Sequence, residues 1–293
     1  MNAENPQAES PRILKEIEYW EQDKISMLPL LEKYPLKHGF TWGKMSENMS
    51  PVYAKEEGAE TVEARIVNFL KSCNMEGKRI NALGVFEGTH MQIMEVSQKD
   101  TEDIPETPVK ANFIYTKDRK VILSIRPGDC NVSIIFAKDK EGRSIAGLIH
   151  SSAHSTNMGL PRYAIRHLIE DEGVEQSSII VGITPGISKE HYSISCEADV
   201  LNNPNLDKVT VERNWKGHIS SKDLSKGDSR PRQVDILGAT IMQFEEEGVL
   251  PQNIQVYEID TYDAAEKGEG FSKRYSDDSG KPQARIMVAV QLA

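Results

Sequence analysis

Three side chains that could bind a metal ion or attack a substrate follow one another along the chain: His90, Cys130 and His150. Two imidazole nitrogens and one thiolate sulfur can hold zinc and leave a fourth position open, where the ion lowers the pKa of bound water. Taken singly, a cysteine in an apolar strand is more often inert core, and a histidine at a strand end is more often a hydrogen-bonded surface residue. The three residues are far apart in the sequence, so the fold must bring them together.

Cys130 follows Asp129 in a polar PGD turn. The turn predicts a thiol at a strand edge, where a cation or a metal can stabilise the thiolate. The same thiol could instead be a nucleophile, with His150 as its base and no metal, as in cysteine hydrolases. The zinc content of the protein distinguishes these two hypotheses.

His150 ends an apolar segment and precedes the small polar turn SSAH at 151–154, which leads into a helix. Backbone N–H groups at such a helix entry can bind an anion. The sequence KDKEG at 138–142 predicts a hairpin between the strand after Cys130 and the strand that ends at His150. Both side chains would then reach the same end of a sheet.

The elements that must position these residues are helices and short strands. Apolar residues at helical spacing predict a helix over 61–73, and further helices are expected from Pro161 and from Val234 to a left-handed cap at Gly248. Segments 82–86 and 91–96 predict two strands joined by a tight turn, with His90 at that turn. Four further apolar segments are expected to form the strands of one sheet: 111–115, 121–125, 132–137 and 145–149. Later strands are expected at 179–183, 254–259 and 286–292.

Composition narrows the class of protein. The 293 residues are 38% hydrophobic, which is enough for a substantial core, and the net charge of −10 disfavours binding to nucleic acid or to an anionic membrane surface. A small-molecule partner is therefore expected. Residues 1–25 are expected to form a polar tail and extension without a signal peptide, and residues 26–293 a domain with a polar insertion of loops near 197–233. Three widely spaced cysteines suit a reducing compartment, so we expect a cytoplasmic protein.

The order of these motifs resembles the laccase-domain family, also called YfiH-like proteins and formerly multicopper polyphenol oxidoreductases. HGFTW at 38–42 is similar to the family's opening HGF segment, GTHMQIMEV places the first family histidine on His90, and PGDC is similar to the ADC motif. HSSAHS is similar to HAGWRG with its histidine on His150, and GFSKRYSDDSGKPQAR is similar to the family ending. The shared order over most of the chain carries the resemblance, because each motif alone is unspecific.

This resemblance implies a single α+β domain, layered as helices on mixed β-sheets, with zinc held by His90, Cys130 and His150. It also implies a purine nucleoside enzyme that carries out phosphorolysis, adenosine deamination or both, and some family members carry the name peptidoglycan editing factor. The older copper oxidase label fits poorly, because three ligands offer one site and a laccase needs several coppers.

The resemblance assigns roles to further residues. In deamination, zinc would activate water for attack on the adenine ring, and Asp129 would carry or orient a proton. In phosphorolysis, phosphate would be held near the ribose by Arg274, Arg285, His154 or the backbone after His150. The alternative role of each arginine is a surface salt bridge.

Three positions depart from the family motifs. Ala153 and His154 stand where HAGWRG has tryptophan and arginine, and Thr184 replaces the first glycine of the family's GPxI motif. Histidine offers less charge at neutral pH than arginine and no bidentate fork, and a branched residue restricts a backbone that glycine leaves free. An alternative hypothesis is therefore a diverged family member that binds zinc or a ligand without catalysis.

Overall fold

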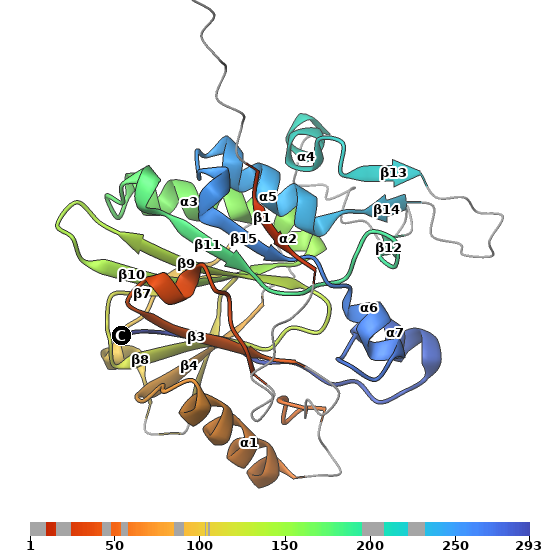
Figure 1. The fold of residues 1–293 in the computed structure, drawn as a ribbon, viewed down its shortest axis with the longest axis horizontal. Helices are drawn as coiled ribbons and strands as arrows, with labels where there is room; N and C mark the ends of the chain where they lie inside the picture. The colour runs from red at the N-terminus through yellow and green to blue at the C-terminus, as the bar shows by residue number, and fades with distance from the viewer. Residues whose placement is uncertain are drawn as a thin grey trace, which may run out of the picture.

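Two mixed β-sheets stack face to face at the centre of the molecule, and helices cover their outer faces (Figure 1). The computed structural model describes residues 10–15, 25–42, 48–53, 58–84, 91–102, 104, 106–194, 208–221 and 232–293. The seven-stranded sheet has the order β1 (Arg12–Leu14), β15 (Ile254–Tyr257), β11 (Ile180–Ile183), β9 (Asn131–Lys138), β10 (Ser144–Ser151), β7 (Phe113–Thr116) and β5 (Ile93–Glu95). The six-stranded sheet has the order β2 (Ile25–Ser26), β3 (Leu36–Thr41), β16 (Val288–Leu292), β8 (Val121–Ile125), β4 (Lys78–Leu83) and β6 (Glu106–Lys110).

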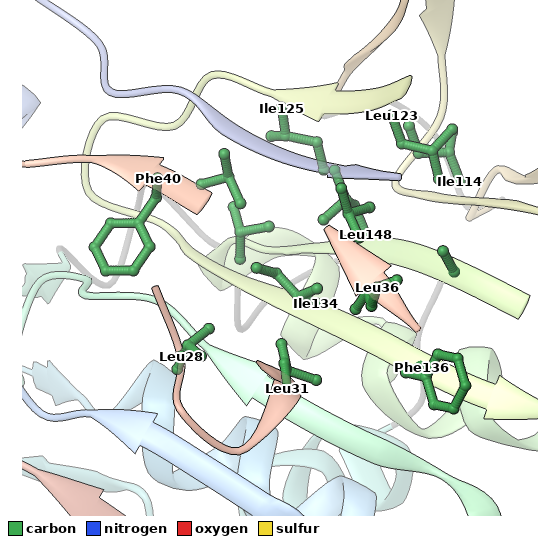
Figure 2. Packing of buried hydrophobic residues seen from close by; sticks show 14 of the residues in the cluster. Leu28, Leu31, Leu36, Phe40, Ile114, Leu123, Ile125, Ile134, Phe136 and Leu148 are labelled. Carbon is green, nitrogen blue, oxygen red and sulfur yellow. The ribbon is translucent and has the colours of Figure 1, made fainter. Parts of the chain in front are cut away.

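Alternation along the strands sends side chains to both faces of each sheet, because successive residues of a strand point to opposite sides. On β9, Ile134 and Phe136 pack into the layer between the sheets, where they meet Leu123 of β8 and Leu36 of β3 (Figure 2). Ile135, between them, faces the helices on the other side. Each fully buried side chain of this kind contributes about 1.5–3 kcal/mol through the hydrophobic effect.

Helices close the two outer faces. Helix α1 (Ala59–Ser72) covers the six-stranded sheet, and its buried residues recur at helical spacing: Val62, Ile66, Phe69 and Leu70. Helices α3 (Leu160–Glu170) and α5 (Ile236–Glu246) cover the seven-stranded sheet. The order of layers is helix, sheet, sheet, helix, which confirms the predicted α+β class of helices packed on mixed sheets.

Short elements complete the chain. Helices α2 (Ala153–Asn157), α6 (Thr261–Glu266) and α7 (Lys273–Ser279) lie near the end of the seven-stranded sheet (Figure 1), and single 3₁₀ turns lie at Leu31–Lys33, Gln98–Asp100, Gln176–Ser178 and Pro251–Asn253. The predicted end of α5 is confirmed, because Gly248 has φ of 82°, a left-handed conformation that costs glycine little. None of the helices that the structure describes is long and apolar enough to span a membrane.

Strand pairing differs from the sequence prediction in two places. The expected hairpin of 82–86 with 91–96 is wrong, because β4 pairs with β6 and β8 in one sheet and β5 pairs with β7 in the other. The four strands between 111 and 149 do not form one sheet either, because β8 belongs to the six-stranded sheet. Short apolar segments reveal strands, but pairing depends on partners that are distant in the sequence.

The polar segment near 197–233 contains more structure than the predicted loops. Its described residues form α4 (Lys208–Trp215), β13 (Ile219–Ser221) and β14 (Arg232–Val234), and β14 lies between β13 and β12 (Ser193–Ile194) in a three-stranded sheet. Trp215 and Val234 are buried there in a small apolar cluster. A few apolar residues spread among many charged ones give almost no periodic signal, which explains why the sequence indicates only loops.

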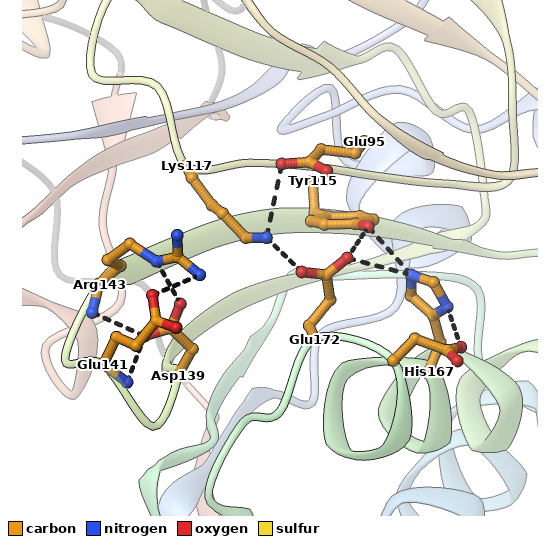
Figure 3. A network of polar contacts seen from close by, with 9 residues as sticks. Glu95, Tyr115, Lys117, Asp139, Glu141, Arg143, His167 and Glu172 are labelled. Carbon is orange, nitrogen blue, oxygen red and sulfur yellow. Dashed lines mark hydrogen bonds and ion pairs between the residues drawn. The ribbon is translucent and has the colours of Figure 1, made fainter.

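A polar network ties the end of α3 to the seven-stranded sheet, away from the apolar layers (Figure 3). Lys117 and Tyr115 both donate to Glu172, and His167 is 3.0 Å from the Tyr115 hydroxyl oxygen. Because Glu172 and Lys117 are largely shielded from water, this network restrains the helix end more than an exposed ion pair would.

Candidate functional site

A cavity of about 930 Å³ lies where the ends of β9 and β10 meet α2, α7 and the six-stranded sheet. Six residues predicted from the sequence line it together: Asp129, Cys130, His150, His154, Arg274 and Arg285. The seventh, His90, lies outside the described residues. A cavity of this volume suits a small-molecule ligand.

The β9–β10 hairpin brings Cys130 and His150 to one end of the sheet, as predicted. The strands are antiparallel, with His150 opposite Val132 and Ser151 opposite Asn131, and Cys130 directly precedes β9. The turn contains Gly142 at φ of 77°. The hairpin therefore places a sulfur and an imidazole on one wall of the cavity.

The protonation states of this pair follow from burial. Burial raises the pKa of the Cys130 thiol to about 12, with a further contribution from the Asp129 charge, while Arg285 and Lys273 oppose the shift. Burial, and then the charge of Arg285, lower the pKa of His150 to about 4. In this environment the pair is a thiol and a neutral imidazole at neutral pH.

The donor set fits zinc. Neutral imidazole and thiolate sulfur are common zinc ligands, and a bound dication supplies the positive charge that a buried thiol needs in order to lose its proton. A metal-free cysteine hydrolase would need a thiolate at Cys130 and a histidine base, and the zinc content of the protein distinguishes it from the zinc site.

Asp129 is half-buried next to Cys130, and its two carboxylate oxygens already accept hydrogen bonds. The Thr261 hydroxyl donates to Oδ1 at 2.9 Å, and the backbone N–H of Arg274 donates to Oδ2 at 2.7 Å. Burial raises the pKa of Asp129 to about 6, against the opposing effects of hydrogen bonds from Ser272 and Thr261 and of the Arg285 charge. This carboxylate fixes the start of α7 against the turn that carries Cys130.

Arg274 and Arg285 contact neutral groups in the cavity wall. Arg285 donates to the Ala284 carbonyl oxygen at 2.8 Å, and its guanidinium carbon lies 4.2 Å from the centre of the Tyr53 ring. Arg274 donates to the Ser193 carbonyl oxygen at 3.3 Å and lies 5.3 Å from the centre of the Tyr192 ring. No described carboxylate forms an ion pair with either arginine, so the surface salt bridge is not their role among these residues.

The other two cations of the cavity are neutralised by carboxylates. Arg126 donates to both oxygens of Glu106, at 2.8 and 2.5 Å, and Lys273 lies 2.5 Å from Asp277. Among the described cations of the cavity wall, Arg274 and Arg285 are therefore the two that form no ion pair with a carboxylate. Two arginines are well suited to hold a phosphate or carboxylate.

The altered turn HSSAHS forms a regular helix start. Ser152 is the N-cap of α2, its hydroxyl accepts from the Ser155 N–H at 3.1 Å, and the Ser155 hydroxyl accepts from the Ser152 N–H at 2.8 Å. His154, in this first turn of α2, is half-buried in the cavity wall, and burial lowers its pKa.

Thr184 does not strain the backbone as expected. It is fully buried, and its hydroxyl accepts the N–H of Val132 at 3.1 Å, next to Asn131 whose side chain donates to the Thr184 carbonyl oxygen at 3.0 Å. The branched hydroxyl thus links β11 to the start of β9, close to Cys130.

Several side chains of the cavity were not predicted from the sequence, and they include Tyr53, Arg126, Tyr192 and Lys273. Lys273 directly precedes Arg274, so the prediction of Arg274 as a site residue could have indicated Lys273 as well. Tyr192 lies in the segment ITPGISKEHYSI, which is similar to the family's GPxI and YEV stretch, whereas Tyr53 lies outside the motifs. The fold brings each tyrosine ring against an arginine.

A second group of metal-capable side chains lies outside the cavity lining. The ligand atoms of His191, Asp260 and Asp263 all lie within 4.8 Å of one another. Asp260 is also the N-cap of α6, and it accepts hydrogen bonds from Ser188 and, at 2.6 Å, from His191. These hydrogen bonds hold the loop before β12, which carries Tyr192, against α6.

Three solved structures share the fold. A hypothetical protein YfiH from Bacillus licheniformis has a TM-score of 0.73 at 16% identity, covering 94% of this chain and 98% of its own. YlmD from Geobacillus stearothermophilus has a TM-score of 0.69 at 17% identity, with coverages of 94% and 98%. A Neisseria meningitidis protein of the DUF152 family has a TM-score of 0.62 at 14% identity, with coverages of 92% and 99%. At these identities the likeness establishes the fold.

The family itself is established by a match along the sequence. A comparison with curated protein sequences finds no match. The family model described as multi-copper polyphenol oxidoreductase laccase matches residues 44–289, a range that includes the β9–β10 hairpin, α2 and both arginines of the cavity. The chain belongs to this laccase-like, YfiH-type family.

Proposed function

We propose that the cavity binds a purine nucleoside together with phosphate and cleaves the glycosidic bond by phosphorolysis, with zinc held by Cys130, His150 and His90. One observation carries the proposal. Arg274 and Arg285 line the same cavity as the Cys130 and His150 pair, and no described carboxylate forms an ion pair with either arginine.

In this reaction the two arginines bind the phosphate anion. An oxygen of phosphate bonds to the anomeric carbon of the ribose as the bond from that carbon to the purine nitrogen breaks, and the purine leaves with its electron pair and takes up a proton. Positive charge develops on the sugar during bond breaking, so a phosphate anion held beside it stabilises the transition state. Two guanidinium groups fix and orient that anion.

Zinc, when bound, supplies a Lewis-acid charge next to the reacting groups and keeps Cys130 in its thiolate form. Asp129 positions neighbouring groups of the site. Its carboxylate holds the backbone N–H of Arg274 and the Thr261 hydroxyl, so it fixes the arginine-bearing helix start relative to Cys130.

The test is a nucleoside panel with zinc-loaded protein. Adenosine, inosine and guanosine are incubated with and without phosphate, and the free base, ribose 1-phosphate and ammonia are measured. Phosphate-dependent release of base supports the proposal, whereas ammonia release without phosphate indicates deamination. Unchanged nucleosides under both conditions overturn it and favour the non-catalytic alternative.

Two arginine variants and a matched control locate the anion site. Arg274→Gln and Arg285→Gln are expected to raise the KM for phosphate by about 10–100-fold each, because each removes a charge-assisted contact worth about 1.5–3 kcal/mol. Arg119→Gln, at an exposed position outside the cavity lining, is expected to leave the KM unchanged.

A further inference from the structure

Each arginine of the proposed anion site has an aromatic ring against its guanidinium group. The guanidinium carbon of Arg274 lies 5.3 Å from the centre of the Tyr192 ring. That of Arg285 lies 4.2 Å from the centre of the Tyr53 ring. We infer that the two tyrosines are positioning residues, whose rings hold the guanidinium groups in place to bind phosphate. The inference rests on the proposed function, because it concerns the arginines of that same site.

The ring of Tyr192 is itself held firmly. The Tyr192 N–H donates to the Ser188 carbonyl oxygen at 2.9 Å, and the Tyr192 carbonyl oxygen accepts the N–H of Val234 at 3.1 Å. The ring packs against the apolar cluster that contains Trp215. Tyr192 therefore offers Arg274 a fixed aromatic surface.

Arg274 needs this surface because its other support acts mainly on the backbone. The backbone N–H donates to Asp129 at 2.7 Å, whereas both terminal nitrogens of the guanidinium lie 3.3 Å from the Ser193 carbonyl oxygen, which is long for a hydrogen bond. The remaining guanidinium N–H groups have no acceptor among the described residues. These N–H groups are the ones that can donate to an anion.

Arg285 is supported in a similar way. Its Nη1 donates to the Ala284 carbonyl oxygen at 2.8 Å, and its Nη2 donates to Oε1 of Gln283 at 3.3 Å. The Tyr53 N–H donates to the Ser50 carbonyl oxygen at 3.1 Å, which fixes the turn that carries the ring. All of these partners are neutral, so the guanidinium is oriented while it keeps its charge.

A ring and a carboxylate have different consequences for an incoming anion. Glu106 accepts two hydrogen bonds from Arg126, so an anion at Arg126 must displace a carboxylate or meet its repulsion. An aromatic face attracts the cation through its quadrupole and carries no net charge. The guanidinium of Arg274 is therefore held without competition for the anion.

Isothermal titration of the zinc-loaded protein with inorganic phosphate tests the two rings without reference to turnover. Tyr192→Leu and Tyr53→Leu are each expected to weaken phosphate binding about 3–10-fold, because leucine fills space but has no aromatic face. Tyr192→Phe and Tyr53→Phe are expected to restore the affinity to within about twofold of the wild type. If phenylalanine binds phosphate as weakly as leucine does, the ring is not what matters and the inference is overturned.

The two positions also guard against loss of folding. Tyr53 is 40% exposed, so Tyr53→Leu is expected to fold, as a thermal melt can verify, even if Tyr192→Leu does not. In turnover, Tyr53→Leu is expected to raise the KM for phosphate with a smaller change in kcat. A folded Tyr53→Leu protein with wild-type affinity for phosphate overturns the inference.

Tyr163 of α3 provides the matched control. Its ring lies 5.7 Å from the guanidinium carbon of Arg166, the same kind of contact, but neither residue lines the cavity. Tyr163→Leu is expected to leave the affinity for phosphate unchanged. An equal loss of affinity in this variant would show that the effect is indirect and would overturn the assignment to the cavity rings.

Binding and turnover together separate this inference from the proposed function. Weaker phosphate binding in the leucine variants, with nucleosides left unchanged by the wild type, supports the inference and overturns phosphorolysis. Phosphorolysis by a protein whose leucine variants bind phosphate normally supports the proposed function and overturns the inference. A wild-type protein that binds no phosphate overturns both.

Discussion

Arg285 reaches the cavity through space that Gly128 leaves open. A Cβ atom at position 128 would lie 3.3 Å from the Arg285 Nη1 atom and 3.2 Å from the Cβ of Lys273. Both contacts are tighter than usual, so an added methyl group must displace the guanidinium or the start of α7. At the scale of single residues, the absence of one side chain thus sets the place of the proposed anion site.

Gly128→Ala is therefore expected to weaken phosphate binding about 3–10-fold with only a small change in stability, since contacts of 3.2 and 3.3 Å require the Lys273 Cβ or the Arg285 guanidinium to move only slightly. Isothermal titration with inorganic phosphate measures the change in phosphate affinity, and a thermal melt measures the change in stability. Gly142→Ala is the control, because the left-handed φ of 77° makes it destabilising while no other atom lies within 4 Å of the added methyl. Equal phosphate affinity in Gly128→Ala and wild type would contradict the expectation.

His38 makes stability depend on pH. It is fully buried, its Nε2 accepts the Leu28 N–H at 2.9 Å, and burial lowers its pKa from 6.5 to about 4. The unfolded chain binds a proton below pH 6.5 and the folded chain does not, so stability is fully present above pH 6.5 and falls as pH decreases toward 4. The loss amounts to about 3 kcal/mol at pH 4.

His38→Gln keeps a side-chain acceptor but cannot titrate. Between pH 6.5 and pH 4 its free energy of unfolding in urea is expected to fall by about 3 kcal/mol less than that of the wild type. His167→Gln, in the partly exposed network of Figure 3, is the comparison and should keep the steep profile. Parallel profiles for wild type and His38→Gln would show that other groups govern acid unfolding.

At the scale of elements, Arg162 of α3 joins α4 and α5. Its buried guanidinium donates to Asn214 and pairs with Glu246, whereas Arg166, one turn later, is 37% exposed and pairs with Glu247 at 2.7 Å. Arg162→Leu is expected to cost about 3 kcal/mol, because a partly buried carboxylate and an amide lose their partner. Arg166→Leu is expected to cost less than about 1 kcal/mol. Urea unfolding of both variants tests this difference, and similar losses would contradict it.

The sequence predicts elements better than their partners. Helices at 61–73 and after Pro161 and the strands of the β9–β10 hairpin could be found, because apolar period and turn residues act locally. The hairpin also predicts that Cys130 and His150 share one end of a sheet. The separation of β4 from β5 into different sheets could not be found, because it is decided by packing between distant segments.

Site residues that lie in recognisable motifs could be predicted from the sequence. Site residues that only the folded structure brings to the cavity could not. Arg274 and Arg285 come from the family ending, and both reach the cavity. The environment of each arginine was not predictable, because the contacts of Arg285 with Tyr53 and of Arg274 with Tyr192 join segments that are distant in the sequence.

At the scale of the whole molecule, the cavity joins both sheets, α2 and α7, so a bound ion is expected to stabilise the entire domain. A ligand present at about 1,000 times its Kd adds about 4 kcal/mol to the free energy of unfolding. Chelation of zinc is therefore expected to lower Tm by several degrees in the wild type and not in Cys130→Ser.

His191→Ala is the control for this experiment, because the His191, Asp260 and Asp263 group offers another set of ligands. The chelator-dependent change in Tm should persist in this variant. If it disappears there and persists in Cys130→Ser, the stabilising ion is bound outside the cavity.

The place of β16 has a consequence for synthesis of the protein. This strand, at 288–292, lies between β3 and β8 in the middle of the six-stranded sheet, although β3 ends at Thr41. A ribosome adding about 5–20 residues per second needs on the order of tens of seconds to pass from one strand to the other. During this time β3 and β8 have no central partner, and exposed strand edges invite pairing with other chains. We therefore expect the edges of β3 and β8 to be the places where the nascent chain is most prone to pair with other chains until β16 emerges.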